Sequence, residues 1–305
     1  MKRFLKYLLI TLIVTTVFLC CFSMYIGNFM FNYVLNPHYE NNISTKIKSN
    51  EQVTINNQQW LNHNSIKISI QSEDQLTLNA YYIKNNSHNY MILVHGFMSS
   101  AASMVSPAKR MMKNNFQLII PDLRGHGLSE GDYIGMGWVD KNDIMKWIEY
   151  ITLKDSQASI VLYGISMGGS AVMNVAGENP KNVKAVIEDC GFTSAWDIFS
   201  SQLKEYGKME NFILYTSTFM TYLRAGYNLK EASSINQVKK TNIPILFIHG
   251  SSDDFVPLSM MYELYENTSS PKEKLVIENA GHADCNGTNA RLYYSTIENF
   301  LKKYL

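Results

Sequence analysis

The sequence predicts an α/β fold in which a mostly parallel sheet is covered by helices on both faces. Short apolar runs, which are typical of buried strands, alternate with helical patterns from residue 90 to residue 188 and again after residue 243. Within residues 160–176, a buried strand, a very tight turn and a helix follow one another directly. At 305 residues, the chain is long enough for one large domain of this kind and an appendage.

Composition excludes several classes of protein. Hydrophobic residues make up 46% of the chain and charged residues 17%, which is typical of a globular protein rather than a disordered one. The net charge of +1 and the lack of a basic run with interleaved aromatic residues argue against a nucleic-acid partner. The four cysteines form no C-x-x-C motif and no cluster with histidine, so we expect neither a metal nor a cofactor.

The amino-terminal segment has the composition of a membrane-spanning helix. Basic residues precede residues 8–34, an uncharged run longer than the roughly 20 apolar residues that cross a bilayer. A cleaved signal peptide would have a shorter apolar core and a small-residue cleavage site, and a lipoprotein signal would have small residues before Cys20. Neither pattern is present. We therefore expect residues 1–34 to be an uncleaved signal anchor that crosses the cell membrane once. The amino terminus is expected to be cytoplasmic and the body of the chain extracellular.

A polar connection follows the anchor. Residues 35–64 are rich in Asn and Gln and have little periodicity, so we expect a tether with a short helix near residues 58–61. The aromatic residues at the end of the anchor are expected to form a belt at the outer membrane interface. They are Tyr25, Phe29, Phe31 and Tyr33.

The remaining residues, 65–305, are expected to form the main domain. Alternating apolar and polar residues predict an antiparallel hairpin from strands at 65–70 and 75–83. Continuous apolar runs predict further strands at 90–94, 116–121, 159–163, 183–188, 243–248 and 274–277. Helical patterns are expected at about 103–113, 138–153, 167–176, 258–265 and 289–304.

The strand–helix alternation is interrupted at about residues 191–241. This segment contains two helical patterns, 196–206 and 210–223, and we interpret it as a small helical cap over the carboxyl ends of the strands. Its apolar side chains pack onto the domain, line a pocket for an acyl chain, or form a surface that dips towards the membrane, and the sequence leaves these interpretations open.

The turn within residues 160–176 has the pattern of a nucleophile elbow. Gly164-Ile165-Ser166-Met167-Gly168 fits G-x-S-x-G, in which a serine at a strand tip is held in a strained conformation with its Oγ exposed. Glycines two residues before and after the serine are needed because strand and helix approach too closely for a Cβ. Ser166 is therefore the candidate nucleophile.

Two loops at the carboxyl ends of late strands offer the acid and the base that a serine nucleophile needs. They contain Asp253 and His282, which follow the serine in the chain order that doubly wound hydrolases use. Asp254 is the alternative acid, but the position between His249-Gly250 and Val256-Pro257 favours Asp253. The sequence thus predicts a Ser-His-Asp triad.

The oxyanion that forms during acyl transfer needs two backbone N–H donors. One is expected from Met167, directly after the nucleophile, and the other from Phe97, in the loop after the strand at 90–94. His95, His126 and His249 precede glycines in strand-end loops, and we interpret them as structural turn residues.

These motifs together resemble the α/β-hydrolase superfamily. The similarity is greatest to membrane-anchored or secreted bacterial hydrolases related to the serine aminopeptidase S33 and Bem46-like groups. The resemblance implies an eight-stranded sheet whose second strand is antiparallel, and a triad of Ser166, Asp253 and His282. The matching segments are His95–Phe97, Asp122–Ser129, Gly164–Gly169, Glu188–Phe192, His249–Pro257 and Gly281-His282.

The expected function is that of a serine esterase, which cleaves an ester or related acyl bond through an acyl-enzyme. The substrate class is open between a small-molecule or lipid-like acyl ester and a peptide. A serine aminopeptidase is the alternative enzyme, and a catalytically inactive surface binding protein is the alternative of another class. A disulfide between Cys190 and Cys285 also stays open, because both follow strand tips at one edge of the sheet.

Overall fold

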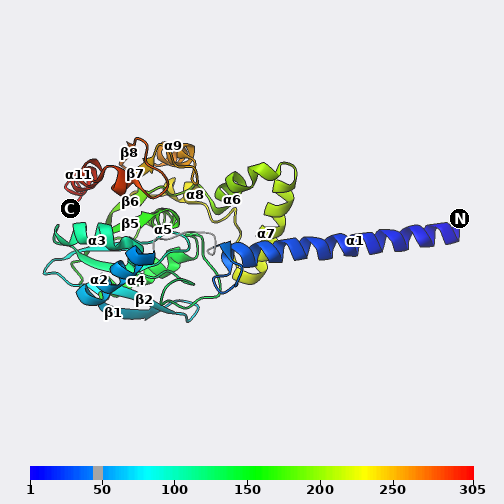
Figure 1. Ribbon diagram of the computed structural model, residues 1–305, viewed down its shortest axis with the longest axis horizontal. Coiled ribbons are helices and arrows are strands. Elements are labelled where there is room, and N and C mark those ends of the chain that lie inside the picture. Colours follow the sequence, from blue (N-terminus) through cyan, green and yellow to red (C-terminus); the bar gives the residue numbers. More distant parts are fainter. Residues whose placement is uncertain (44–50) are drawn as a thin grey trace.

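The protein consists of a rounded domain from which one long helix projects (Figure 1). The computed structural model describes residues 1–43 and 51–305. The projecting helix is α1 (Lys2–Met30), and it continues into the π-helical turn η1 (Phe31–Leu35). Among the described residues, this segment is the one helix long and apolar enough to cross a membrane, and none of its most apolar stretch is buried.

Eight strands form one sheet at the centre of the domain, as the sequence predicts. In chain order they are β1 (Ile66–Gln71), β2 (Thr77–Ile83), β3 (Asn89–Val94), β4 (Gln117–Pro121), β5 (Ser159–Ile165), β6 (Val183–Asp189), β7 (Ile245–Gly250) and β8 (Lys272–Ile277). Their order across the sheet is β1-β2-β4-β3-β5-β6-β7-β8. Strand β2 is antiparallel to both neighbours, whereas all pairs from β4 to β8 are parallel. The expected antiparallel second strand is therefore confirmed.

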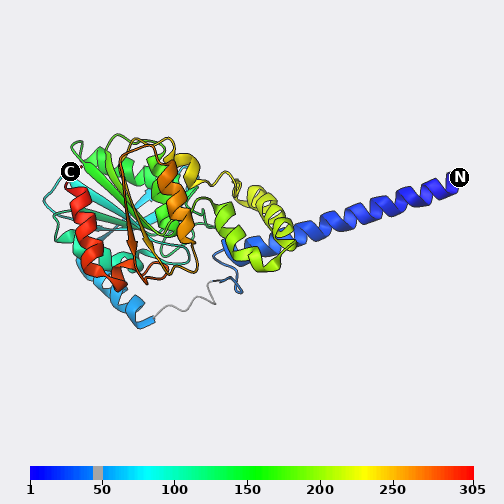
Figure 2. The ribbon, with the colours of Figure 1, turned by 90° about the horizontal axis from the view of Figure 1, so that it is seen from above.

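Helices cover both faces of this sheet and create two apolar cores (Figure 2). Successive residues of β3 show the division, because Ile92 belongs to one core and Met91 and Leu93 to the other. The first core includes residues of α4 (Asp140–Lys154), α5 (Met167–Ala176), α8 (Ser234–Val238) and α9 (Leu258–Asn267). The second includes residues of α2 (Glu51–Asn64), α3 (Val105–Met112), α10 (Cys285–Thr288) and α11 (Ala290–Leu301).

The expected cap is present as a helical unit inserted after β6. It consists of α6 (Ala195–Leu203), the short 3₁₀ turn η4 (Lys204–Tyr206) and α7 (Met209–Ala225). Ser194 begins α6 by accepting a hydrogen bond from the N–H of Asp197 at 3.0 Å. The cap lies on the side of the domain from which α1 departs (Figures 1 and 2).

The segment expected to be a tether contains more structure than predicted. Helix α2 spans Glu51–Asn64 rather than one short turn, and residues 44–50 lie outside the described part of the chain. Leu61 is fully buried in the second core, and Gln58 Nε2 donates to the hydroxyl of Tyr81 at 2.7 Å. Trp60 packs on the domain, with Lys109 Nζ 5.2 Å from the centre of its ring. Non-local packing thus stabilises a helix whose own composition is weakly amphipathic.

The end of α1 is docked on the cap helix α7. Gly27 is buried against α7 so closely that a Cβ there would lie 2.3 Å from the backbone oxygen of Thr216. The rings of Phe22 and Phe212 stack with centroids 6.1 Å apart. Arg224 Nη1 donates to the side-chain oxygens of both Asn28 and Asn32, at 2.9 and 2.7 Å.

One residue of the expected aromatic belt is placed differently by the structure. Phe31 is 2% exposed and belongs to the first core, with the guanidinium of Arg224 4.1 Å from the centre of its ring. Tyr25 is exposed, and Phe29 stacks on Tyr33 with ring centroids 5.9 Å apart. Phe31 could not be distinguished by sequence, because its burial depends on the cap that folds over it.

Candidate active site

The turn between β5 and α5 has the strained geometry expected of a nucleophile elbow. Ser166 has φ 57° and ψ −120°, a backbone conformation that non-glycine residues rarely adopt. A Cβ on Gly164 would lie 2.1 Å from the backbone oxygen of Gly168, and one on Gly168 would lie 2.2 Å from that of Val94. The two glycines are therefore required by backbone packing, which forces Ser166 to the tip of the strand.

The structure brings the three predicted side chains of the triad together. His282 Nε2 lies 2.8 Å from Ser166 Oγ, and His282 Nδ1 lies 2.8 Å from Asp253 Oδ2. The other oxygen of Asp253 accepts the backbone N–H groups of Phe255 and Val256, at 2.9 and 2.8 Å. These bonds fix the imidazole with a proton on Nδ1 and leave Nε2 free to accept the serine proton.

The carboxylate of Asp253 is held in its charged form. Its side chain is fully buried, which by itself opposes ionisation, but the hydrogen bonds from His249 and His282 and the backbone donors outweigh burial and lower its pKa. The neighbouring Asp254 is exposed. This contrast agrees with the choice of Asp253 as the candidate acid.

A second histidine also contacts Asp253. His249 Nε2 lies 3.2 Å from Asp253 Oδ2 and 2.9 Å from the backbone oxygen of Val256, and its side chain is fully buried. Burial opposes charge on His249, but the bonds to Asp253 and Val256 raise its pKa overall. His249 therefore gives Asp253 Oδ2 a second imidazole contact beside that of His282. The sequence around His249 predicts a turn residue and carries no signal for this contact.

The loop after β3, which contains Phe97, borders the nucleophile. A Cβ on Gly96 would lie 3.3 Å from Ser166 Cβ and 3.8 Å from its Oγ. His126 Nε2 accepts the N–H of Met98 at 3.2 Å, and His95 Nε2 accepts the N–H of Leu123 at 3.0 Å. Two buried imidazoles therefore fix the loop in which the second oxyanion donor is expected.

Both imidazoles must be neutral to accept these bonds. Burial lowers the pKa of His95 to about 3, with the nearby ring of His126 adding to the effect. Burial also lowers the pKa of His126. The Nδ1 atoms donate to backbone oxygens, His95 to that of Gly96 at 2.7 Å and His126 to that of Arg124 at 2.9 Å. The loop after β3 is thus held by two imidazoles that accept their hydrogen bonds as neutral groups.

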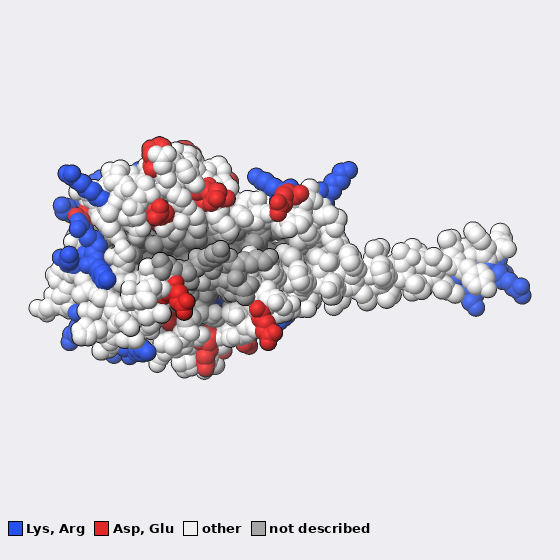
Figure 3. Space-filling model, viewed as in Figure 1, with Lys and Arg blue, Asp and Glu red and all other residues white. Residues whose placement is uncertain are grey.

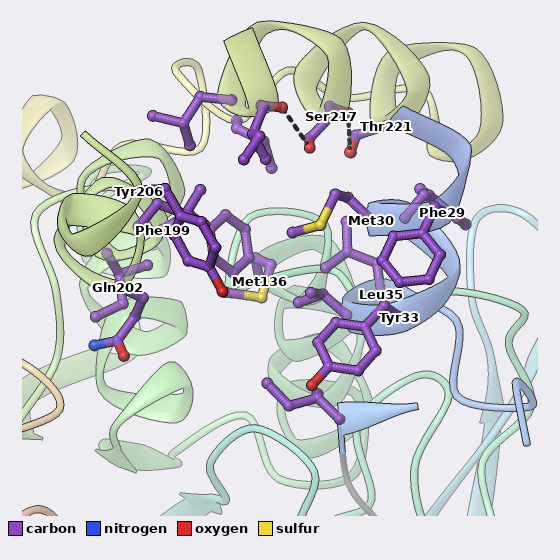
Figure 4. A pocket seen from close by; sticks show the side chains of 18 of the residues that line it. Phe29, Met30, Tyr33, Leu35, Met136, Phe199, Gln202, Tyr206, Ser217 and Thr221 are labelled. Atoms are coloured by element: carbon purple, nitrogen blue, oxygen red, sulfur yellow. Dashed lines mark hydrogen bonds between the residues drawn. The ribbon is translucent and has the colours of Figure 1, made fainter. Parts of the chain in front are cut away.

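A pocket of about 640 Å³ opens beside Ser166. Its walls come from the domain, from the cap helices α6 and α7, and from the end of α1 with η1, and their side chains converge on one space (Figure 4). The volume is in the range of sites for small organic ligands. Most of the lining is apolar; its members include Phe97, Met136, Phe192, Phe199, Leu203, Phe212, Ile213 and Phe255.

The two cysteines near this edge are buried free thiols rather than a disulfide. Burial raises the pKa of Cys190 well above its usual value, and that of Cys285 as well. The sulfur of Cys190 lies within 4.8 Å of ligand atoms of Asp253 and His282, a spacing that would suit a metal ion. The carboxylate of Asp253 and the imidazole of His282 are already hydrogen-bonded to each other at 2.8 Å, so these three side chains do not offer a free set of donors to a metal.

Two family profiles match this chain. One, described as "Serine aminopeptidase, S33", matches residues 85–210, and another, described as "Serine hydrolase (FSH1)", matches residues 164–283. The protein bem46 of Schizosaccharomyces pombe is 27% identical over 244 residues, which are 77% of this chain and 76% of that protein. YqkD of Bacillus subtilis is 26% identical over 228 residues, 73% of this chain and 75% of YqkD.

Solved structures share the fold. An esterase of Pyrococcus furiosus superposes with a TM-score of 0.66 at 21% identity, covering 81% of this chain and 93% of the esterase. Est1E from Butyrivibrio proteoclasticus, solved with ferulic acid, superposes with a TM-score of 0.60 at 18% identity, covering 78% and 98%.

The chain has the α/β-hydrolase fold. The two profile matches and the similarity to bem46 support a place in the α/β-hydrolase superfamily. Within this superfamily fold, the elbow serine, the acid loop and the histidine loop lie at the carboxyl ends of β5, β7 and β8. The parallel register of these strands places the three loops at one edge of the sheet. Each of these three residues lies in a local sequence motif and could therefore be predicted. No local motif marks the residues of α1 that line the pocket.

Proposed function

We propose that this α/β hydrolase is a serine esterase that cleaves an acyl ester through a covalent acyl-enzyme. One observation carries the proposal: Ser166 Oγ, His282 and Asp253 Oδ2 form a continuous chain of hydrogen bonds of 2.8 Å each. Nucleophile, base and orienting acid in this geometry are what acyl transfer to water requires.

The proposed cycle uses each of these groups in turn. His282 Nε2 takes the proton of Ser166 as Oγ attacks the substrate carbonyl, and buried Asp253 stabilises the imidazolium that results. The N–H groups of Met167 and Phe97 would receive the oxyanion. His282 then gives the proton to the leaving alcohol, and a water molecule repeats the steps to release the acid.

An ester is favoured over a peptide by the chemistry of the pocket. An aminopeptidase needs a carboxylate to bind a free amino group. Of the three cap glutamates, Glu205 lines the pocket but is exposed at its rim, and Glu210 instead accepts the hydroxyl of Ser200. Glu231 is exposed and is not part of the pocket lining. The apolar remainder suits an acyl group. If the protein turned over aminoacyl amides faster than short esters, a peptide substrate would be favoured instead.

The proposal places α1 in the cell membrane as an uncleaved anchor, with the catalytic domain outside. Its support is that the helix continues without interruption from the exposed apolar stretch into the core, where Phe31 and Leu35 are 2% and 3% exposed. Basic residues at the free end favour a cytoplasmic amino terminus. Accessibility of an introduced cysteine on each side of intact cells would test this topology.

The test of the catalytic assignment is Ser166→Ala in the full-length protein in detergent. Hydrolysis of p-nitrophenyl acetate should fall by at least about 1,000-fold, because the nucleophile of a triad is lost. Labelling by a fluorophosphonate probe should disappear as well. Ser259→Ala, at an exposed serine of α9, is the matched control and should leave both signals unchanged. Unchanged hydrolysis by Ser166→Ala would refute the assignment, and absence of labelling in the unmodified protein would favour an inactive binding protein.

A further inference from the structure

We propose that the outer end of α1 is itself a wall of the substrate site, which takes the acyl chain of an ester lipid directly from the outer leaflet. This inference rests on the proposed function, since it needs Ser166 as the nucleophile and α1 as a membrane span. Water is the second substrate. The ester bond is cleaved, the alcohol leaves with the proton from His282, and hydrolysis of the acyl-enzyme releases a fatty acid.

The end of α1 and η1 contributes a continuous part of the pocket wall. The lining residues of this segment are Ile26, Phe29, Met30, Phe31, Tyr33, Val34 and Leu35. Five of them, Ile26, Phe29, Met30, Tyr33 and Val34, recur at spacings of three and four positions and form a stripe on one helical face. Figure 4 shows Phe29, Met30 and Tyr33 on this helix opposite Phe199 and Tyr206 of the cap. The helix therefore contributes one side of the cavity, and the cap contributes the other.

The stripe begins where a membrane span would end. After Lys6, the chain has no Lys, Arg, Asp or Glu before Glu40, and Figure 3 shows the stalk free of charge except at its tip. A helix crosses the hydrocarbon in about 20 residues, which places the outer boundary near Ile26. Ile26 is also the first residue of α1 that lines the pocket. The cavity thus opens at the depth of the outer leaflet.

Three polar side chains of the pocket lining are already hydrogen-bonded within the protein. The hydroxyl of Ser217 donates to the backbone oxygen of Ile213 at 2.6 Å, and that of Thr221 donates to the oxygen of Ser217 at 2.8 Å. Gln202 Nε2 donates to the backbone oxygen of Phe255 at 2.8 Å. A long apolar chain therefore enters without leaving these groups unpaired, whereas a polar ligand finds few partners.

The rim and the outer face of the cap have the character of a membrane-facing surface. Phe29, Tyr206 and Met209 line the pocket, yet they are 44%, 54% and 51% exposed. The outer face of α7 exposes four more apolar side chains at helical spacing, namely Tyr215, Phe219, Tyr222 and Leu223. Because α7 is docked on α1, this face stands beside the span and is continuous with it. An amphipathic surface in that position fits the lipid interface rather than water.

The test compares two methionines of the same helix in the full-length protein. Met30→Gln places an amide in the pocket, and Met24→Gln places the same amide on a part of α1 that does not line it, where Met24 is 51% exposed. The measurement is kcat/KM for p-nitrophenyl octanoate divided by that for the acetate. Met30→Gln should lower this ratio about tenfold, because the amide meets the chain without a partner. Met24→Gln should leave it unchanged, and Met30→Leu should retain the preference.

A second measurement tests the route of entry. In one arm, the protein is reconstituted in phosphatidylcholine vesicles that also contain a fluorogenic long-chain acylglycerol ester. In the other arm, protein-containing vesicles without the ester are mixed with separate vesicles that contain it. Hydrolysis should be at least about tenfold faster in shared vesicles, because transfer through water exposes every methylene of the chain. Equal rates in shared and separate vesicles would overturn this inference, provided that acetate hydrolysis still depends on Ser166. Equal octanoate-to-acetate ratios for Met30→Gln and Met24→Gln would overturn it under the same condition. Loss of that dependence would instead overturn the proposed function.

Discussion

Replacing Asp253 with Asn changes one atom and tests the hydrogen-bond chain most directly. Asp253 receives donors on both oxygens: the N–H groups of Phe255 and Val256 on Oδ1, and the imidazoles of His249 and His282 on Oδ2. In the variant, the amide oxygen would stay on the two backbone donors. The amide NH₂ would then face His282, whose Nδ1 would have to accept.

This change reverses the tautomer of the base. With Nδ1 accepting, the proton of neutral His282 moves to Nε2, which lies 2.8 Å from Ser166 Oγ and could no longer take its proton. The negative charge that stabilises the imidazolium is lost at the same time. We expect kcat for p-nitrophenyl acetate to fall roughly 10,000-fold, or about 5.4 kcal/mol in the barrier, as for a triad with its acid neutralised.

The matched control is Asp254→Asn, the same substitution at the adjacent exposed position. Its activity should stay within a factor of about two, because surface substitutions outside such networks have small effects. Near-UV circular dichroism of both variants would establish that the fold is intact. The reasoning is refuted if Asp253→Asn keeps a tenth or more of the activity, or if the two variants lose equal amounts.

Two further predictions concern stability. Gly168→Ala should destabilise the domain by about 3 kcal/mol or more in urea unfolding, because its Cβ would lie 2.2 Å from the backbone oxygen of Val94. Gly281→Ala, with nothing within 4 Å, should change little, and comparable losses would contradict this account. Burial raises the pKa of Glu188 from 4.5 to about 8, so its contribution to stability is full below pH 4.5 and is lost as the pH rises to about 8. As the pH rises from about 5 to about 9, the free energy of unfolding of Glu188→Gln should therefore increase by up to about 5 kcal/mol relative to that of the unmodified protein. A difference between the two proteins that does not change with pH would contradict this prediction.

Local patterns were sufficient for the sheet and for the three residues of the candidate triad. The elbow around Ser166 could be predicted because its glycines are required by contacts between residues close in sequence, such as Gly164 and Gly168. The loops of Asp253 and His282 could be predicted because parallel strands bring their carboxyl ends to the same edge of the sheet. The second contact to Asp253, from His249, has no such signal, since it depends on how the loop folds back.

Features that depend on distant parts of the chain were not predictable. Residues 51–64 lack a strong helical pattern, yet burial of Leu61 against the sheet stabilises a helix there. Phe31 and Tyr25 are both aromatic residues near the end of the apolar segment, so their sequence context does not separate them. Only Phe31 is covered by Arg224 of the cap. The pocket wall likewise arises from contact between residues nearly two hundred positions apart, such as Phe22 and Phe212.

The docking of α1 on the cap affects how a soluble version of this enzyme should be designed. A cut at the usual place, after the apolar segment, would remove Gly27, Phe31 and Leu35 together with one side of the cavity. The truncated domain would expose the inner face of α7 and would offer short, water-soluble esters an open cleft. Substrate profiles from such a fragment would describe a different binding site, so α1 and the domain are best studied as one piece.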